Sequence, residues 1–138
     1  MSIEAGLFQL LSQSAALQAL VGNPAAFVFP VMLPEKPPLP CISYQLVGGS
    51  ANPALTRSGV QRRRYQFDFW ADYEQGTYDQ AIALRDAVIH LLNGFTGALP
   101  NGFYVTSILY HQSLDGFEND ARQYRCTAEF YITYNLPA

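Results

Sequence analysis

The sequence has 138 residues, of which 49% are hydrophobic, so a single domain over residues 1–138 has enough apolar surface to bury a core. A formal net charge of −3 excludes a whole-molecule field that would draw the protein to DNA or to an anionic membrane. Only 14% of the residues are charged, against about a quarter in typical domains, which indicates that an assembly covers part of the surface.

Residues 3–21 form the first predicted element, because their apolar side chains recur at helical spacing. Ser2 and Ser14 are both N-cap residue types, so we expect either one bent helix or two short helices. Gly22 can adopt the left-handed conformation that ends a helix. The apolar positions are Ile3, Leu7, Leu10, Leu11, Leu17, Leu20 and Val21.

Prolines dominate the next stretch, exclude a helix there, and leave two extended segments at residues 27–32 and 41–47. The first segment contains Pro30, which suits the edge of a sheet. Residues 48–59 are rich in Gly, Ser, Asn and Pro, so they are predicted as a long exposed loop between two antiparallel strands. Loops of this length in a compact domain are usually functional or mobile.

Residues 61–70 alternate in polarity, which predicts a strand with one buried face and one wetter face. The buried face carries Tyr65, Phe67 and Phe69, and the wetter face carries Arg64, Gln66, Asp68 and Trp70. Because Asp68 shares its face with Arg64, an ion pair within or between chains explains this carboxylate better than a role as general base.

Thr77 and Gln80 have the spacing of a capping box, which predicts a helix that runs to Asn93 and Gly94. The apolar stripe of this helix is predicted to face the core. The stripe consists of Ala81, Leu84, Val88 and Leu91, with Ile82 and Ile89 beside it.

Residues 103–111 are predicted as a further strand, and residues 112–121 as an exposed acidic loop. Residues 122–134 alternate regularly, so they are predicted as the last strand. One face of that strand carries Tyr124, Cys126, Ala128, Phe130, Ile132 and Tyr134, and the other carries Arg125, Thr127, Glu129, Tyr131 and Thr133.

This order of elements predicts an α+β fold. Links of hairpin type join strand 41–47 to strand 60–70 and strand 103–111 to strand 122–134. We therefore expect an antiparallel or mixed sheet of four to five strands, with the N-terminal helix and one central helix packed on one face.

Two further features bear on the compartment. The sequence starts without a basic leader, and no apolar run approaches the roughly 20 residues that cross a bilayer, so we expect no membrane segment. Cys41 and Cys126 are the only cysteines, and neither has a partner at metal-ligand spacing. We expect both thiols to be reduced and buried, in a chain that folds in the cytosol.

We find no motif for catalysis, for cofactor binding or for a metal, and we expect none of these. His90 and His111 have no acid or nucleophile at a telling spacing, which favours structural roles. Asp115, Glu118 and Asp120 resemble a calcium-binding cluster, but their spacing does not match that of a calcium loop, so a solvated acidic segment is the better interpretation.

Arg62, Arg63 and Arg64 are consecutive, and Arg57 is the nearest other basic residue. In a strand, Arg62 and Arg64 share one face and Arg63 takes the other, so the three do not form one flat patch. The guanidinium group binds phosphate and carboxylate equally well, which leaves three interpretations open: nucleic-acid binding, a solvated strand end, and contact with a neighbouring subunit. We favour pairing with the acidic segment 115–120 of a neighbouring subunit.

The elements together resemble the tail terminator or tail-completion proteins of long-tailed bacteriophages and related prophage particles. The resemblance covers nearly the whole chain, from an N-terminal helix that ends in "ALVG" through the approach "LPEKPPLPCISYQL" and the strand "YQFDFWA". It continues through the helix "YDQAIALRDAVIHLLNG" to the closing strand "YRCTAEFYITY".

The resemblance implies a non-enzymatic virion protein, assembled in the host cytoplasm, that forms a ring of six subunits at the head-proximal end of the tail. Such a ring sits on the tail tube protein, stops its polymerisation and presents the docking surface for the head connector. DNA would only pass through the lumen. Two alternatives remain: a head-completion or neck protein of the same particle, and a small-ligand-binding α+β domain.

Overall fold

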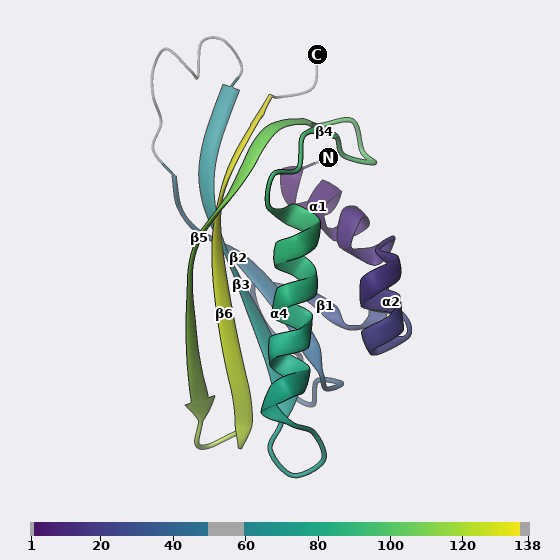
Figure 1. The fold of residues 1–138 in the computed structure, drawn as a ribbon, viewed down its shortest axis with the longest axis vertical. Helices are drawn as coiled ribbons and strands as arrows, with labels where there is room; N and C mark the ends of the chain where they lie inside the picture. Colours follow the sequence, from purple (N-terminus) through teal and green to yellow (C-terminus); the bar gives the residue numbers. More distant parts are fainter. Residues whose placement is uncertain (1, 50–59, 136–138) are drawn as a thin grey trace.

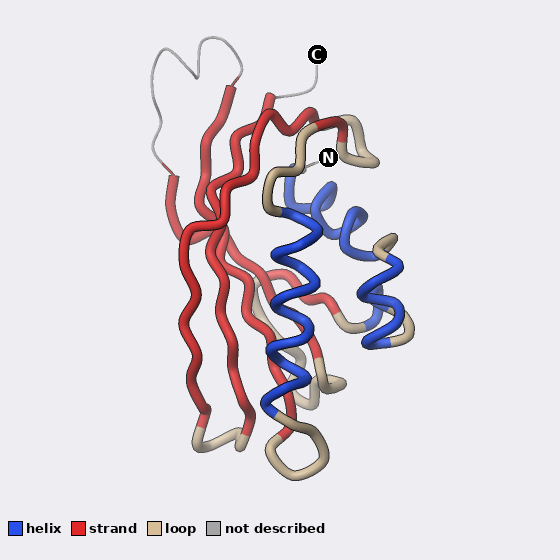
Figure 2. Tube along the Cα trace, viewed as in Figure 1, coloured by secondary structure: helices blue, strands red, loops and turns tan. Residues whose placement is uncertain are grey.

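The computed structural model describes residues 2–49 and 60–135, in which six strands form one mixed sheet in the order β1-β2-β3-β6-β5-β4. The helices all lie on one face of this curled sheet (Figures 1 and 2). The fold is therefore of the predicted α+β class. In this part of the chain the helical elements are α1 (Ile3–Ser12), α2 (Ala15–Val21), the 3₁₀ turn η1 (Pro24–Ala26) and α4 (Tyr78–Leu92). The strands are β1 (Val28–Pro30), β2 (Cys41–Gly49), β3 (Val60–Asp72), β4 (Gly97–Ala98), β5 (Tyr104–Glu118) and β6 (Gln123–Asn135).

The N-terminal segment forms two short helices, the second of the two predicted arrangements. The Ser2 hydroxyl accepts a hydrogen bond from the backbone N–H of Ala5, which caps α1. The Ser14 hydroxyl accepts one from the backbone N–H of Leu17, which starts α2 after a break in the helix. Gly22 then ends α2 with φ of 81°, as predicted.

The sheet has more strands than the four to five that the sequence predicts. Strand β1 pairs in parallel with β2 at one edge, and β4 pairs with β5 at the other. These edge strands hold three and two residues, so they are too short to show an alternating pattern. The antiparallel pairs β2–β3 and β5–β6 are those predicted.

The prediction of an acidic loop at residues 112–121 is wrong. Strand β5 continues to Glu118, and Asp115 lies opposite Cys126 of β6. Only a tight turn separates β5 from β6. The side chains from Leu109 to Phe117 are exposed on both faces of the strand. Because neither face is buried, the sequence of this part of β5 does not alternate between apolar and polar residues.

A single cluster of buried side chains lies between the helices and the sheet. Strand β3 contributes Tyr65, Phe67 and Phe69, and β6 contributes Phe130 and further alternate residues, as predicted. Phe67 stacks on Tyr44 at 5.6 Å between ring centroids and meets Phe130 edge-on at 5.5 Å. Both free cysteines are buried in the strands, also as predicted.

Helix α4 packs across β3 and β6 and is fixed at both ends (Figure 1). Thr77 and Gln80 form the predicted capping box. At the other end Asn93 caps the helix, and Gly94 takes a φ of 82°. Leu92, rather than the predicted Leu91, completes the buried stripe. None of the helices in residues 2–49 and 60–135 is long and apolar enough to cross a membrane.

Replacement of Thr77 by alanine is expected to lower the free energy of unfolding by about 1 kcal/mol, because the N-terminal N–H groups of α4 lose their cap. Urea denaturation followed by circular dichroism measures the change. Gln18→Ala on the exposed side of α2 is the matched control and should leave stability within about 0.5 kcal/mol of wild type. Equal effects of the two substitutions would contradict this role of the cap.

Candidate functional site

The sheet face opposite the helices carries most of the polar side chains of β3, β5 and β6, and we call it the open face. Its members follow from the alternation of the strands: Tyr65 and Phe67 point to the helices, whereas Arg64 and Gln66 point away. The predicted division of β3 into two faces is therefore confirmed. The open face includes Arg62, Arg64, Gln66, Asp68, Leu114, Glu118, Arg125, Thr127 and Glu129.

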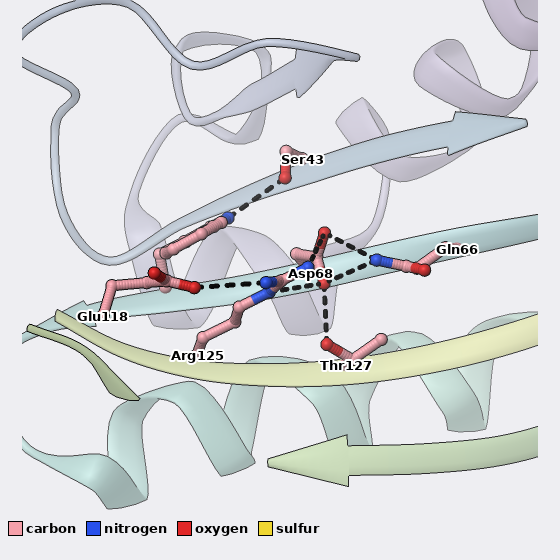
Figure 3. Close-up of polar contacts among 7 residues, drawn as sticks. Ser43, Gln66, Asp68, Glu118, Arg125 and Thr127 are labelled. Atoms are coloured by element: carbon pink, nitrogen blue, oxygen red, sulfur yellow. Dashed lines mark hydrogen bonds and ion pairs between the residues drawn. The ribbon is translucent and has the colours of Figure 1, made fainter. Parts of the chain in front are cut away.

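A buried carboxylate organises the middle of the open face. Asp68 is only 5% exposed and accepts hydrogen bonds from three side chains (Figure 3). The Thr127 hydroxyl donates at 2.7 Å, and the Gln66 amide donates at 3.1 and 3.2 Å to the two carboxylate oxygens. Arg125 Nε lies 3.2 Å from the same group. Because its oxygens already accept several donors, this carboxylate is held as a structural charge.

Arg125 is the cation that balances Asp68, and it was missed as a site residue by the sequence analysis. Its Nη1 also donates to Glu118 at 3.2 Å, and its guanidinium lies 5.3 Å from the centre of the Trp70 ring. Burial alone would lower the pKa of Arg125, but its hydrogen bonds and charge interactions with Asp68 and Glu118 raise it. The Trp70 indole N–H in turn donates to the Ser43 hydroxyl at 3.0 Å (Figure 3).

The predicted ion pair at Asp68 therefore exists, but its partner is Arg125 instead of Arg64. Residues on adjacent strands of one face lie closer than residues four apart along one strand. The sequence carries a single signal for Arg125: in the alternation of β6 it points to the face that does not carry its neighbours Tyr124 and Cys126. A depression of about 450 Å³ lies over this network, with Gln66, Arg125 and Glu129 among its lining residues.

The arginine triplet divides between the two faces, as predicted. Arg62 is exposed, with its guanidinium 4.7 Å from the centre of the Tyr131 ring. Arg64 Nε lies 3.2 Å from Glu129, also on the open face. Arg63 lies on the helix side, with Nη1 4.0 Å from Glu4 of α1. Arg57 lies outside the described residues.

The three acidic candidates do not converge on one point. Asp115 faces α4 and accepts hydrogen bonds from Tyr78 and Arg85, whereas Glu118 faces away and contacts Arg125. Asp120 is exposed in the β5–β6 turn. In the part of the chain that the structure describes, no group of three His, Cys, Asp or Glu residues is arranged to hold a metal ion.

Asp115 links β5 to α4 through two charge-assisted contacts. Burial alone would raise the pKa of Asp115, but the hydrogen bond from Tyr78 and the charge of Arg85 lower it below its ordinary value of 3.8. The same hydrogen bond raises the pKa of Tyr78 to about 12. Burial is the main cause that raises the pKa of the Cys126 thiol to about 12, so this thiol is protonated at neutral pH.

Neither histidine contacts the Asp68 network within the described residues. His90 is in the last turn of α4, as predicted. His111 does not end its strand: it lies within β5, at the irregularity between Tyr110 and Gln112, with its ring 4.9 Å from that of Tyr131. Both side chains are exposed.

The comparisons with known proteins decide the family. Residues 5–135 match the family described as "Tail completion protein gp17". The chain belongs to this family. No curated protein matches the sequence. The match, which covers nearly the whole chain, assigns it to the tail-completion proteins.

Two solved structures share the fold of this tail-completion protein. One is a chain of a structure described as "Virion of native gene transfer agent (GTA) particle", with a TM-score of 0.71 at 19% identity. That match covers 98% of this chain and 96% of the other. A second structure has a TM-score of 0.56 at 16% identity, over 99% of this chain and 94% of the other. The fold therefore persists where few residues are shared.

Asp68→Asn is expected to lower the free energy of unfolding by about 2 kcal/mol, because Arg125 loses its buried counter-charge. Glu118→Gln is the matched control: its side chain is 47% exposed and faces the same guanidinium, so its loss should change stability by less than about 1 kcal/mol. Urea denaturation at pH 7 measures both. A larger effect for Glu118→Gln would contradict the assignment of Asp68 as the main partner.

Asp115 should also stabilise the fold in a pH-dependent way. Because its pKa is lowered by folding, its contribution is present above the ordinary value of 3.8 and is lost as the pH falls through the lower folded pKa. The stability difference between wild type and Asp115→Asn should therefore shrink in acid. Urea titrations between about pH 2 and pH 6 measure it. A Tyr78→Phe background, which removes a hydrogen bond that lowers the pKa, should weaken this dependence, and an unchanged dependence would contradict it.

Proposed function

We propose that this tail-completion protein forms a ring at the head-proximal end of the tail tube, stops polymerisation of the tube, and presents the docking surface for the head connector. The family match over residues 5–135 carries the proposal. A ring of six subunits would match a sixfold tube. Within this proposal the protein is non-enzymatic and the chain acts as one domain.

The chemistry of the open face supports a passive wall more than a catalytic site. Its central carboxylate is saturated by donors, and the half-buried guanidinium of Arg125 is neutralised by Asp68 and Glu118. Phosphate binding depends on cations that are free to replace counterions. Ion pairs of this kind reduce the attraction for DNA, so DNA could slide through the lumen without specific binding.

The arginine and acidic candidates have their place in the same proposal. We assign Arg57, Arg62, Arg63 and Arg64 of one subunit to contacts with the segment that holds Asp115, Glu118 and Asp120 in the next. Within the described residues, Arg63 Nη1 lies 4.0 Å from Glu4, and Arg62 has an exposed contact with Tyr131. Exposed pairs of this kind contribute less than about 1 kcal/mol, so they can be exchanged for contacts between subunits.

Deletion of the gene for this protein from its particle should yield tubes that grow beyond their normal length, because nothing stops polymerisation. Electron microscopy of negatively stained particles measures the length distribution, and expression of the wild-type chain in trans is the control that should restore it. Tubes of normal length that lack heads would instead indicate a neck protein, and intact particles of normal length would contradict the proposed function.

A further inference from the structure

The outer edge of β5 is open over half of its length. Contacts from residues 93–98 satisfy the first part: Gly94 N–H donates to the carbonyl of Ile108, and the Asn93 side chain accepts from the N–H of Tyr110. From His111 to Glu118, no hydrogen bond from elsewhere in the described residues reaches this outer edge. An unpaired edge of eight residues is a template for another strand.

The opposite edge of the same sheet is open as well. Strand β1 pairs with β2 only from Ile42 to Tyr44, and Val31 N–H adds one bond to the Tyr44 carbonyl. Beyond Tyr44, the outer side of β2 meets no partner strand within residues 2–49 and 60–135 as far as Gly49. Neither open run contains proline or lysine, two residue types that proteins commonly use to block edge pairing.

Exposed apolar side chains flank both open runs. Beside β5, Leu114 is 74% exposed and Phe117 is 38% exposed. Beside β2, Val31 and Met32 are 69% and 77% exposed, and Leu46 is 46% exposed. Val31 also has a φ of 64°, a strained conformation for a β-branched residue. Clustered apolar exposure of this kind marks surfaces that another protein covers.

We propose that the open edge of β5 in one subunit pairs with the open edge of β2 in the next copy of this chain, so that the sheets join into one closed ring of strands. This inference rests on the proposed ring and identifies the surfaces that form it. The partner is a second copy because one sheet presents both edges, which is the requirement for a head-to-tail contact that repeats.

The strand directions and register are compatible with closure. Within one subunit β2 is antiparallel to β5, and rotation about a ring axis preserves this relation between neighbours. Gln45 and Gln112 lie at the same height in the sheet, because they are connected by consecutive strand pairs. Gln45 pairs with Gln66, Gln66 with Glu129, and Glu129 with Gln112. From that level the two open runs extend in opposite directions. The strands must therefore tilt to bring the runs to one height.

The size of this tilt follows from strand geometry. The midpoints of the two runs lie about five residues apart along the strands, or roughly 17 Å at the usual rise. From β2 to β5 of one subunit there are three strand-to-strand spacings, and the proposed interface adds a fourth. Together the four spacings measure about 19 Å across the strands. Together these distances require a tilt of about 40°, which is within the range of about 35–45° at which strands close into barrels.

Charge complementarity favours the same pairing. Arg63 and Arg64 lie opposite Gly49 and Gly48, beside the open run of β2. The open run of β5 carries Asp115 and Glu118. Across the proposed interface the two arginines lie two strands from Asp115, roughly 10 Å between backbones, which an arginine and an aspartate side chain span together, whereas Glu118 lies at the far end of the paired runs. The basic edge of one subunit would thus meet the acidic edge of the next.

Disulfide trapping in purified particles tests this pairing. Gln45 and Gly116 both lie on the open face and come opposite each other at about the offset derived above, so the double variant Gln45→Cys with Gly116→Cys should place two thiols across the interface. The native thiols are fully buried and give no background. Oxidation should give a ladder of linked chains up to the ring size, which a reductant abolishes. The control, Leu20→Cys with Gly116→Cys, uses an exposed residue of α2 and should give no ladder.

Particles of the double variant that have normal tails and no ladder would overturn the edge pairing and leave the proposed function intact. Leu114→Lys supplies a second test, because a lysine at a 74% exposed site leaves the fold unchanged but opposes strand pairing. Its incorporation into particles should fall at least tenfold relative to Leu20→Lys, with the circular dichroism spectrum unchanged. Normal incorporation of Leu114→Lys would also overturn the edge pairing, whereas the deletion experiment tests the proposed function itself.

Discussion

The antiparallel pairing of β3 with β6 is the constraint on which the rest of the structure depends. The two strands pair along 13 residues of each, without a break in register. Because side chains alternate, this register places Tyr65, Phe67 and Phe69 of β3 on the helix side together with Phe130, Ile132 and Tyr134 of β6. A shift of β3 by one residue would bury Arg64 and Asp68 under the helices and expose Phe67 and Phe69. The cost of that exchange fixes the register, and with it the position of α4 and the composition of the open face.

The same register explains why a carboxylate is buried on a face without helices. Asp68 lies opposite Thr127 and one step from Arg125, so the neighbouring strand supplies both a hydroxyl donor and a cation. The guanidinium of Arg125 also lies over the Trp70 ring, 5.3 Å from its centre. A buried ion pair of this kind contributes less to net stability than to the choice of one arrangement, because only the native register pairs these groups.

The sequence predicted what local chemistry determines and failed where the partner strand decides. The caps at Ser14 and Thr77 and the alternation of β3 are local signals, and each was confirmed. The end of β5 was predicted as a loop because its residues are polar, although pairing with β6 holds them extended. The pair of Asp68 with Arg125 joins residues 57 positions apart, and no periodicity within one segment reveals it.

In the proposed ring, edges that are open in one subunit become the means of assembly. A head-to-tail contact either closes into a ring or continues as a filament, and the rotation between subunits decides which. Edge pairing between β5 and β2 directs association around the ring, so closure consumes both open edges and leaves none for further growth. Neither edge then points along the tube axis. A protein built in this way can occupy the end of a tube without extending it, because both open strand edges of each sheet are already paired within the ring. The two rims of the ring also differ, so the rim that binds the tube is not repeated on the other side.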